Sequence, residues 1–535
     1  MVQARSFSKA RLALTATGLG LALLATSACA LRPIPAEAPP GPSIEMRIAQ
    51  GPILGVDEGA VLSFKNIPFA APPVGDLRWR APRPAPQWTE VRDTTAYGAD
   101  CIQSRPVWDD SQSRQPVSED CLTLNVWTPE IRPDGPVPVI VWIHGGGFVM
   151  GSGSQPIFDG VRLAERGAVV VTFNYRLGRF GFFAHPALSA EAGDTPTGNY
   201  GLMDQVAALK WVHENIASLG GDPSRVTIMG QSAGGGSVLQ LMNIEQAQGL
   251  FHRAIVQSGG GRDNWPALRA TGDGRSAESV GMAFAATQNL NNATVADLRA
   301  IPADRIKGRL DLLTPEKDTY SGPLIDGRFV TTQVMEGFRR GARSPVPMII
   351  GATDFELGTV PAVFRGMLAD RTLADLDISR EPLMGIYGDR EALNMFMPSE
   401  LTFIEPARRL AALEADKHHP VWLYNFGYVP ESKRHDTKGA GHATDVAYGF
   451  DTLGRLKDTP SEADQRVATA MADYWVAFAR DGRPDASDQP AWPRYDPESD
   501  QALLIRNDGI VVGPPPHSAR LDALGRMRDG TPSPH

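Results

Sequence analysis

The chain has 535 residues, of which 42% are hydrophobic and 21% are charged, a balance that suits a globular protein with a sizeable core. Its formal net charge is -9 at pH 7. Because an acidic surface repels phosphate backbones, this charge argues against nucleic acid as a partner.

Residues 1–30 have the pattern of an export signal. MVQARSFSKAR carries three basic residues, and the apolar run LALTATGLGLALLATSACA follows it. Thr and Gly interrupt this short run, which disfavours a permanent membrane span. Cleavage after Ala30 is one outcome; the other is a lipid anchor, because LLATSAC resembles a bacterial lipobox with Cys29 as the lipidated residue. Both predict an exported protein that is periplasmic, an outer-membrane lipoprotein, or secreted.

The remaining chain reads as one domain. Residues 31–43, LRPIPAEAPPGPS, are rich in Pro and Ala and predict a tether. No later linker divides the chain, so we expect a single domain over residues 44–520 and a polar C-terminal tail over residues 521–535. The sequence shows no obligate protein partner.

Three cysteines, Cys29, Cys101 and Cys121, are present. If Cys29 is removed or lipidated, one pair is left, and an oxidising compartment allows Cys101 and Cys121 to form a disulfide. Such a bridge stabilises by about 3 kcal/mol in the chain-entropy model. The alternative is two separate buried thiols. No Cys/His spacing typical of a zinc site occurs.

Strand and helix patterns alternate through the middle of the chain. Residues 201–217 place apolar side chains at roughly helical spacing, and SVLQLMN (237–243) also predicts a helix. The short apolar runs predict buried strands: VPVIVWI at the start of 137–147, AVVVTFNYR (168–176), VTIMG (226–230), RAIVQSG (253–259) and VPMIIGAT (346–353). This alternation predicts an α/β fold with a large, mostly parallel central sheet and helices on both faces.

The stretch MGQSAGGGS (229–237) lies between one of these strands and a helix. A glycine-rich stretch can simply be a turn. In a strand–turn–helix, however, G-x-S-x-G is typical of a nucleophile elbow, where side chains two residues before and after the serine would collide. Gly230 and Gly234 occupy those positions, which makes Ser232 the candidate nucleophile.

A serine nucleophile needs a base, a carboxylate that orients the base, and donors for the oxyanion. HGGGF (144–148) follows a strand, and its glycines leave backbone N–H groups free to approach a substrate oxygen. The N–H of Ala233 would add a further donor. Both Asp354 and Glu356, in GATDFELG, are candidate acids.

His442 is the best candidate base, because GAGHATDVAYGF places it in a small-residue loop ahead of a helical pattern. The base is expected after the nucleophile and the acid in chain order. The competing histidines are His252, His418, His419, His435, His517 and His535.

At this point the chain resembles the type B carboxylesterases, the carboxylesterase and cholinesterase group of the α/β-hydrolase fold, from about residue 44 to about residue 515. The resemblance rests on these stretches: KNIPFAAPPVGDLRWRAP (65–82), EDCLTLNVWTP (119–129), WIHGGGF, NYRLGRFGF (174–182), DQVAALKWVHENIASLGGDP (204–223), MGQSAGGGS, YWVAFARDGRP (474–484) and WPRY (492–495).

This resemblance implies roles for individual residues. Ser232 matches the nucleophile, His442 the base, and Glu356, rather than Asp354, the acid. The remaining matches are Gly146, Gly147 and Ala233 as oxyanion donors, Ser258 as a serine that supports the acid, and Cys121 as the second cysteine of the family's first disulfide loop.

Two departures from the family pattern concern charge. Gln231 precedes the serine where many members have glutamate, which disfavours a cationic, choline-like substrate. Asp445 replaces a longer acid often seen three residues after the histidine.

The resemblance implies a serine hydrolase that cleaves small-molecule carboxylic esters through an acyl-enzyme, with no metal or organic cofactor. An amidase or a carbamate hydrolase could use the same groups, and a binding protein is the alternative from another class. The residues that select the ester are not evident. Trp108, in the disulfide loop, could anchor that loop or line the entrance to the site.

Overall fold

The computed structural model describes residues 41–105, 112–130, 135–270, 274–312 and 316–530. The predicted signal, Cys29, most of the predicted tether and Trp108 lie outside these residues. Nothing in the described part of the chain is a helix long and apolar enough to cross a membrane.

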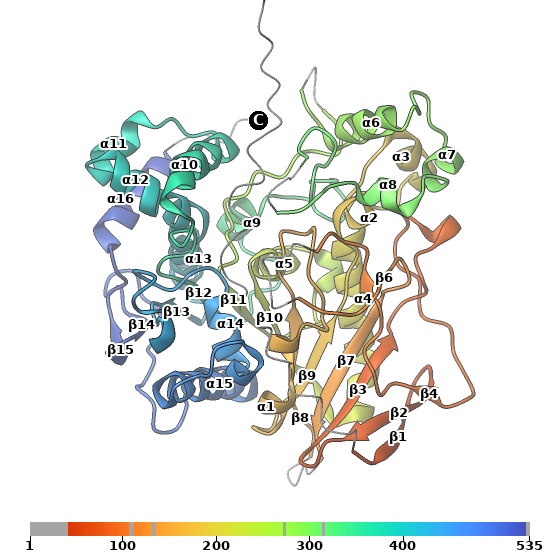
Figure 1. Cartoon of the computed structure of the whole chain (residues 1–535), viewed down its shortest axis with the longest axis horizontal. Helices are drawn as coiled ribbons and strands as arrows, with labels where there is room; N and C mark the ends of the chain where they lie inside the picture. Colours follow the sequence, from red (N-terminus) through yellow and green to blue (C-terminus); the bar gives the residue numbers. More distant parts are fainter. Residues whose placement is uncertain (1–40, 106–111, 131–134, 271–273, 313–315, 531–535) are drawn as a thin grey trace, which may run out of the picture. The chain divides into compact units, whose positions relative to one another are not determined.

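The described residues form a large mixed sheet of 13 strands, in the order β1-β2-β3-β7-β9-β8-β10-β11-β12-β13-β14-β15, with β4 beside β2 (Figure 1). Strands β9, β8 and β10 to β14 pair in parallel, whereas the pairs toward the two edges are mostly antiparallel. The strands are β1 Ser43–Ile48, β2 Gly51–Asp57, β3 Val61–Pro68, β4 Arg92–Asp93, β7 Thr123–Pro129, β8 Val137–Ile143, β9 Val169–Phe173, β10 Gly221–Gln231, β11 Arg253–Gln257, β12 Met348–Thr353, β13 Val421–Phe426, β14 Ala502–Arg506 and β15 Gly509–Gly513. A separate pair consists of β5 Asp100–Cys101 and β6 Val117–Ser118.

Helices follow or connect these strands. They are α1 Val161–Ala164, α2 Gly178–Gly181, α3 Pro186–Ala192, α4 Tyr200–Asn215, α5 Ala233–Leu241, α6 Ala277–Thr287, α7 Val295–Arg299, α8 Ala303–Lys307, α9 Val334–Arg340, α10 Ala362–Leu376, α11 Glu381–Tyr387, α12 Arg390–Ser399, α13 Glu405–Asp416, α14 Thr444–Gly449, α15 Glu462–Asp481 and α16 Ser518–Asp529. A π-helical segment, η5 Glu400–Ile404, joins α12 to α13.

The central strands formed where the sequence predicted them. All of β9, β11 from its second residue and all of β12 are buried, as continuous apolar runs in a parallel sheet covered on both faces should be. The helix predicted at residues 237–243 begins earlier, at Ala233, because the glycines after Ser232 continue directly into its first turn.

Helices cover both faces of the sheet. In β8, Val139 and Val141 belong to one apolar cluster, which also contains Leu209 of α4. The alternate residues, Ile140 and Trp142, belong to a second cluster that includes α14 and α15. Because successive strand residues point to opposite faces, these two clusters are the two sides of the predicted α/β-hydrolase core.

A third apolar cluster joins α10, α11, α12 and α16. Leu521 and Leu524 of α16 are buried in it. The boundary predicted after residue 520 therefore falls inside a helix, and the packed structure continues to Asp529. Polar residues outnumber apolar ones in this segment, but its two leucines cover apolar side chains from α11 and α12.

Cys101 and Cys121 form a disulfide, which confirms the predicted pairing over two separate thiols. Both cysteines are buried. The bridge closes a loop that begins at β5 and passes through β6 before the chain enters β7.

Candidate active site

Ser232 occupies the single residue between β10 and α5. Its backbone has φ 57° and ψ -126°, a conformation that residues other than glycine rarely adopt. Two hydrogen bonds hold it: its N–H donates to the Gln257 carbonyl at 3.0 Å, and its carbonyl accepts from the Gly236 N–H at 2.8 Å. The serine is therefore held by backbone contacts on both sides, at the start of a helix.

The flanking glycines are required by close backbone contacts. A Cβ on Gly230 would lie 2.5 Å from the carbonyl carbon of Gly234. A Cβ on Gly234 would lie 2.0 Å from the carbonyl oxygen of Ile143, at the end of β8. Side chains are excluded at both positions, as the sequence pattern predicted.

The glycine loop after β8 lies against Ser232. Strands β8 and β10 are parallel neighbours, so their carboxyl ends meet, and a Cβ on Gly145 would be 3.1 Å from the Ser232 Cβ. Gly146 and Gly147 have φ of 100 and 61. No described residue accepts a hydrogen bond from the N–H groups of Gly146, Gly147 or Ala233. Three backbone donors thus remain free beside the serine.

His442 and Glu356 are brought together by the neighbouring strands β12 and β13. The Nδ1 of His442 donates to the Glu356 carboxylate, and the His442 backbone N–H donates to the Glu356 carbonyl at 2.8 Å. Glu356 also accepts hydrogen bonds from the Ser258 hydroxyl and, at 2.8 Å, from the Thr353 N–H. The carboxylate is buried, and these donors supply hydrogen-bond partners to both of its oxygens.

Asp354, the other candidate acid, points elsewhere. Its carboxylate accepts a hydrogen bond from the Ala440 N–H at 2.8 Å, in the loop that leads to His442. Burial raises the pKa of Asp354 to about 6. Asp354 therefore helps to fix the histidine loop, whereas Glu356 contacts the imidazole itself.

Opposing effects act on the imidazole of His442. Burial lowers its pKa, but attraction to Glu356, the hydrogen bond to Glu356 and attraction to Asp445 together raise the pKa above its ordinary value. Asp445 is buried, and burial followed by repulsion from Glu356 raises its own pKa to about 6. The neighbouring carboxylates thus stabilise the imidazolium form of His442 more than water does for a free imidazole.

The Nε2 of His442 lies 3.1 Å from the side-chain nitrogen of Gln231, the residue before the serine. An amide N–H can only donate, so this contact assigns the imidazole proton to Nδ1 and leaves Nε2 as the acceptor. The Ser232 hydroxyl has no hydrogen-bond partner in the part of the chain that the structure describes. Sequence reasoning considered Gln231 only for its missing charge and missed this contact.

Phe403 was also missed. Its ring packs on the His442 imidazole, with ring centroids 4.7 Å apart. It projects from the π-helical segment η5, an interruption that often marks functional sites and that no residue pattern in the sequence reveals.

Several competing histidines have other partners. The Nδ1 of His252 accepts from the Val226 N–H at 3.3 Å, and that of His419 lies 2.8 Å from Glu414. The ring of His517 packs near Phe396. His535 lies outside the described residues. In the described chain, no cluster of three or more His, Cys, Asp or Glu side chains is arranged to hold a metal ion.

Comparison with known proteins identifies the family of this chain. A model of the carboxylesterase family matches residues 42–375 and 389–520. Fumonisin B1 esterase of Sphingopyxis macrogoltabida is 35% identical over 480 residues, 85% of each chain. Para-nitrobenzyl esterase of Bacillus subtilis (strain 168) is 34% identical over 495 residues, 89% of this chain and 97% of that one.

Solved structures agree as well. A carboxylesterase of Geobacillus stearothermophilus superposes with a TM-score of 0.77 at 32% identity, covering 90% of this chain and 99% of the other. A para-nitrobenzyl esterase structure also gives 0.77, at 31% identity and the same coverage. The chain belongs to the carboxylesterase family and is a carboxylic ester hydrolase.

Proposed function

We propose that the protein hydrolyses esters through an acyl-enzyme on Ser232, with His442 as the base, Glu356 as the acid and Gly146, Gly147 and Ala233 as oxyanion donors. The observation that carries this proposal is the convergence of three strand ends. The β10–α5 turn presents Ser232, β12 presents Glu356, and the loop after β13 presents His442.

Acylation begins when the Ser232 hydroxyl attacks the ester carbonyl and His442 Nε2 takes its proton. Only the tautomer with its proton on Nδ1 has a lone pair at Nε2, and the bond from Nδ1 to Glu356 supports that tautomer. As the imidazolium forms, Glu356 stabilises its charge. The Gln231 amide must leave Nε2 when the serine engages it, a rearrangement typical of unliganded sites.

The tetrahedral intermediate carries its negative charge on the former carbonyl oxygen. The unused N–H groups of Gly146, Gly147 and Ala233 are suited to bind this oxyanion, and fixed backbone donors need no reorganisation at the moment of reaction. The N-terminus of α5 adds a favourable dipole.

The alcohol then departs with the proton from His442. Water, deprotonated by the same nitrogen, attacks the acyl-enzyme and releases the carboxylic acid. Ser258 supports both steps indirectly, because its hydroxyl is bonded to one oxygen of Glu356 while His442 binds the other.

A burst experiment tests the nucleophile. We expect p-nitrophenyl esters of increasing chain length to give a rapid release of about one p-nitrophenol per enzyme if deacylation is slower than acylation. Quenched protein analysed by mass spectrometry should carry the acyl group on the peptide that contains Ser232. The preferred chain length gives the size of the acyl site.

The matched control is Ser237, a serine within α5, the helix that begins directly after Ser232. Ser232→Ala should lower kcat by about 10⁶-fold, as removal of a serine nucleophile does elsewhere. Ser237→Ala should keep most of the activity, because Ser237 is buried and bonded to Gln205. Acylation of another residue, or turnover by Ser232→Ala at the wild-type rate, would contradict the proposal.

We also propose that residues 1–30 direct export, with Cys29 either lipidated or removed. The disulfide supports this, because disulfides persist in oxidising compartments. Mass spectrometry of the mature N-terminus separates the two outcomes. A lipidated Cys29 that is lost in Cys29→Ala indicates a lipoprotein, whereas a free residue 31 indicates cleavage after Ala30. An uncleaved N-terminus on cytoplasmic protein would refute export.

A further inference from the structure

The glycine loop beside Ser232 is braced from its downstream end. The Gly146 carbonyl accepts hydrogen bonds from the Val149 and Met150 N–H groups, each at 3.0 Å. A Cβ on Gly146 would lie 2.1 Å from the Met150 carbonyl oxygen. The Gly147 N–H belongs to the same peptide group as this carbonyl, so its direction depends on where the backbone of Met150 and Gly151 is held.

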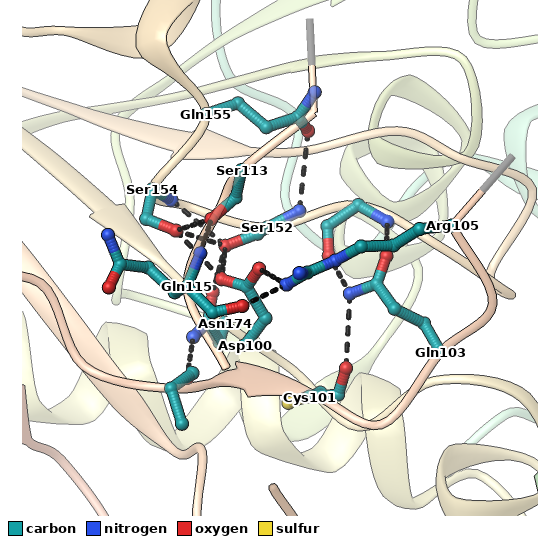
Figure 2. Close-up of polar contacts among 12 residues, drawn as sticks. Asp100, Cys101, Gln103, Arg105, Ser113, Gln115, Ser152, Ser154, Gln155 and Asn174 are labelled. Atoms are coloured by element: carbon teal, nitrogen blue, oxygen red, sulfur yellow. Dashed lines mark hydrogen bonds and ion pairs between the residues drawn. The ribbon is translucent and has the colours of Figure 1, made fainter. Parts of the chain in front are cut away.

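One side-chain amide holds that backbone. The Gln103 side-chain oxygen accepts from the Gly151 N–H at 2.8 Å, and its nitrogen donates to the Gly151 carbonyl at 2.8 Å. The same nitrogen donates to the Cys101 carbonyl at 3.1 Å. Gln103 is buried, so water competes little with these hydrogen bonds. Figure 2 shows Gln103 and its contact with Cys101, next to the hydrogen bonds around Asp100.

The segment that carries Gln103 is itself fixed. Cys101 is bonded to Cys121, and the buried carboxylate of Asp100 accepts from the Ser154 hydroxyl at 2.7 Å, from Ser152 and from Arg105 at 2.6 Å (Figure 2). The disulfide loop and the segment that follows the glycine loop are thus bonded to each other by Gln103 at one end and by Asp100 at the other.

We propose that Gln103 is a positioning residue for ester hydrolysis: its amide aligns the backbone N–H group of Gly147 toward the oxyanion. Gln103 does not touch the reacting atoms. It acts through Gly151, Met150 and the Gly146 carbonyl, and the disulfide loop serves as its support. This role rests on the proposed function, because it requires an oxyanion at that loop.

A purely structural clamp would stabilise the fold without selective effect on the transition state. The two roles differ in one measurement. A trifluoromethyl ketone adds to the serine and leaves an oxyanion on its carbonyl carbon, whereas a simple methyl ketone of the same chain length binds without forming that charge. A positioning residue changes the affinity for the first compound far more than the affinity for the second.

Gln103→Leu removes all three hydrogen bonds while keeping a side chain of similar bulk. We expect kcat and the affinity for the trifluoromethyl ketone to fall together by about 10²-fold, the cost of a displacement of about 1 Å in a group that contacts the transition state. KM and the affinity for the methyl ketone should stay near the wild-type values.

Gln333 provides a matched control, because it holds the backbone of Trp265 in the same way. Its oxygen accepts from the Trp265 N–H at 3.1 Å, and its nitrogen donates to the Trp265 carbonyl at 2.8 Å. Both Gln333→Leu and Gln103→Leu should lower Tm, but Gln333→Leu should leave the ratio of the two ketone affinities unchanged.

Gln103→Glu supplies a second, conservative variant. A protonated carboxyl can accept from the Gly151 N–H and donate to the Gly151 carbonyl, as the amide does, whereas an ionised carboxylate faces that carbonyl without a donor. The ratio of its kcat to that of the wild type should therefore fall as pH rises.

The outcomes separate the two proposals. A wild-type protein that binds the trifluoromethyl ketone no better than the methyl ketone would overturn the proposed nucleophile and oxyanion site. A wild type that discriminates strongly, together with a Gln103→Leu variant that discriminates equally well, would overturn the positioning role alone. A pH-independent ratio for Gln103→Glu would also overturn it.

Discussion

The two halves of the proposed site are held by different kinds of contact. Ser232 and the glycine loop are fixed by backbone: a positive φ, carbonyls that accept N–H groups, and glycines with no room for a Cβ. The imidazole of His442 is held by side chains, since Glu356 binds it, Ser258 binds Glu356, and the buried Asp445 attracts its charged form.

This difference determines how substitutions in each half should change activity. In the serine half, which consists of Ser232 and the glycine loop, added atoms should lower the rate equally at every pH, because the geometry there does not depend on charge. A charge added to or removed from the histidine half should change its pH dependence while leaving the fold in place. Gln257 links the halves, since its carbonyl binds the Ser232 N–H and its side chain donates to Asp445 at 3.0 Å.

Glu356→Gln should produce the largest effect on the histidine half. The amide has nearly the shape of the carboxylate but cannot stabilise the imidazolium and favours the wrong tautomer, so we expect kcat to fall by about 10³–10⁴-fold. KM should change little. Asp354→Asn is the control, because Asp354 binds the Ala440 N–H and not the imidazole. Equal losses in the two variants would contradict the assignment of Glu356.

Gly234→Ala tests the serine half. Its Cβ would lie 2.0 Å from the Ile143 carbonyl oxygen, so the turn must shift, and a displacement of about 1 Å can cost about 10²-fold in rate. The loss should be the same at every pH. The control is Gly236→Ala, whose Cβ has its nearest contact at 3.2 Å and which gains helix propensity. If the plot of kcat/KM against pH for Gly234→Ala is displaced along the pH axis, the geometry around Ser232 depends on charge, contrary to this expectation.

The same contrast explains how far the sequence could be read. The serine half was predictable because its constraints are local: Gly230, Ser232 and Gly234 are adjacent, and each glycine marks a contact with the backbone of the turn or of β8. The fold followed for a similar reason, because continuous apolar runs identify buried parallel strands without knowledge of their neighbours.

The histidine half depends on contacts between distant segments. His442 and Glu356 are separated by 86 residues. Residue patterns therefore left Asp354 and Glu356 equivalent, and only the family resemblance favoured one. The contact of Gln231 with Nε2 and the packing of Phe403 depend on where strand ends and a π-helical segment meet. Similarly, the burial of α16 depends on α11 and α12.

Gln231→Glu tests how a negative charge beside His442 changes the pH dependence of activity. A carboxylate in place of the amide 3.1 Å from Nε2 favours the imidazolium, so the pKa of His442 should rise further. The acidic limb of kcat/KM should move to higher pH, and cationic esters should gain relative to neutral ones of the same shape. Gln231→Met is the uncharged control. A limb that stays in place, or moves to lower pH, would show that the amide does not lie beside the base in solution.

Asp445→Asn should move the acidic limb of kcat/KM to lower pH, by a smaller amount than Gln231→Glu moves it to higher pH. Asp445 acts from farther away: its carboxylate accepts from the Tyr424 hydroxyl at 2.8 Å and attracts the His442 imidazolium without touching it. Removing this charge should lower the pKa of His442, so activity should persist to lower pH.

Stability gives an independent readout of the same substitution. The pKa of Asp445 is raised from 3.8 to about 6 in the folded protein, so the folded state binds this proton more tightly than the unfolded chain does. The resulting contribution to the free energy of unfolding is fully present below pH 3.8 and is lost as pH rises through about 6. Asp445→Asn lacks this loss. Its Tm relative to wild type should therefore increase between about pH 4 and pH 6 and stay level above that range, whatever the constant cost of the new amide. A Tm difference that does not depend on pH would mean that folding does not raise the pKa of Asp445. In that case Asp445→Asn should also leave the acidic limb of kcat/KM in place.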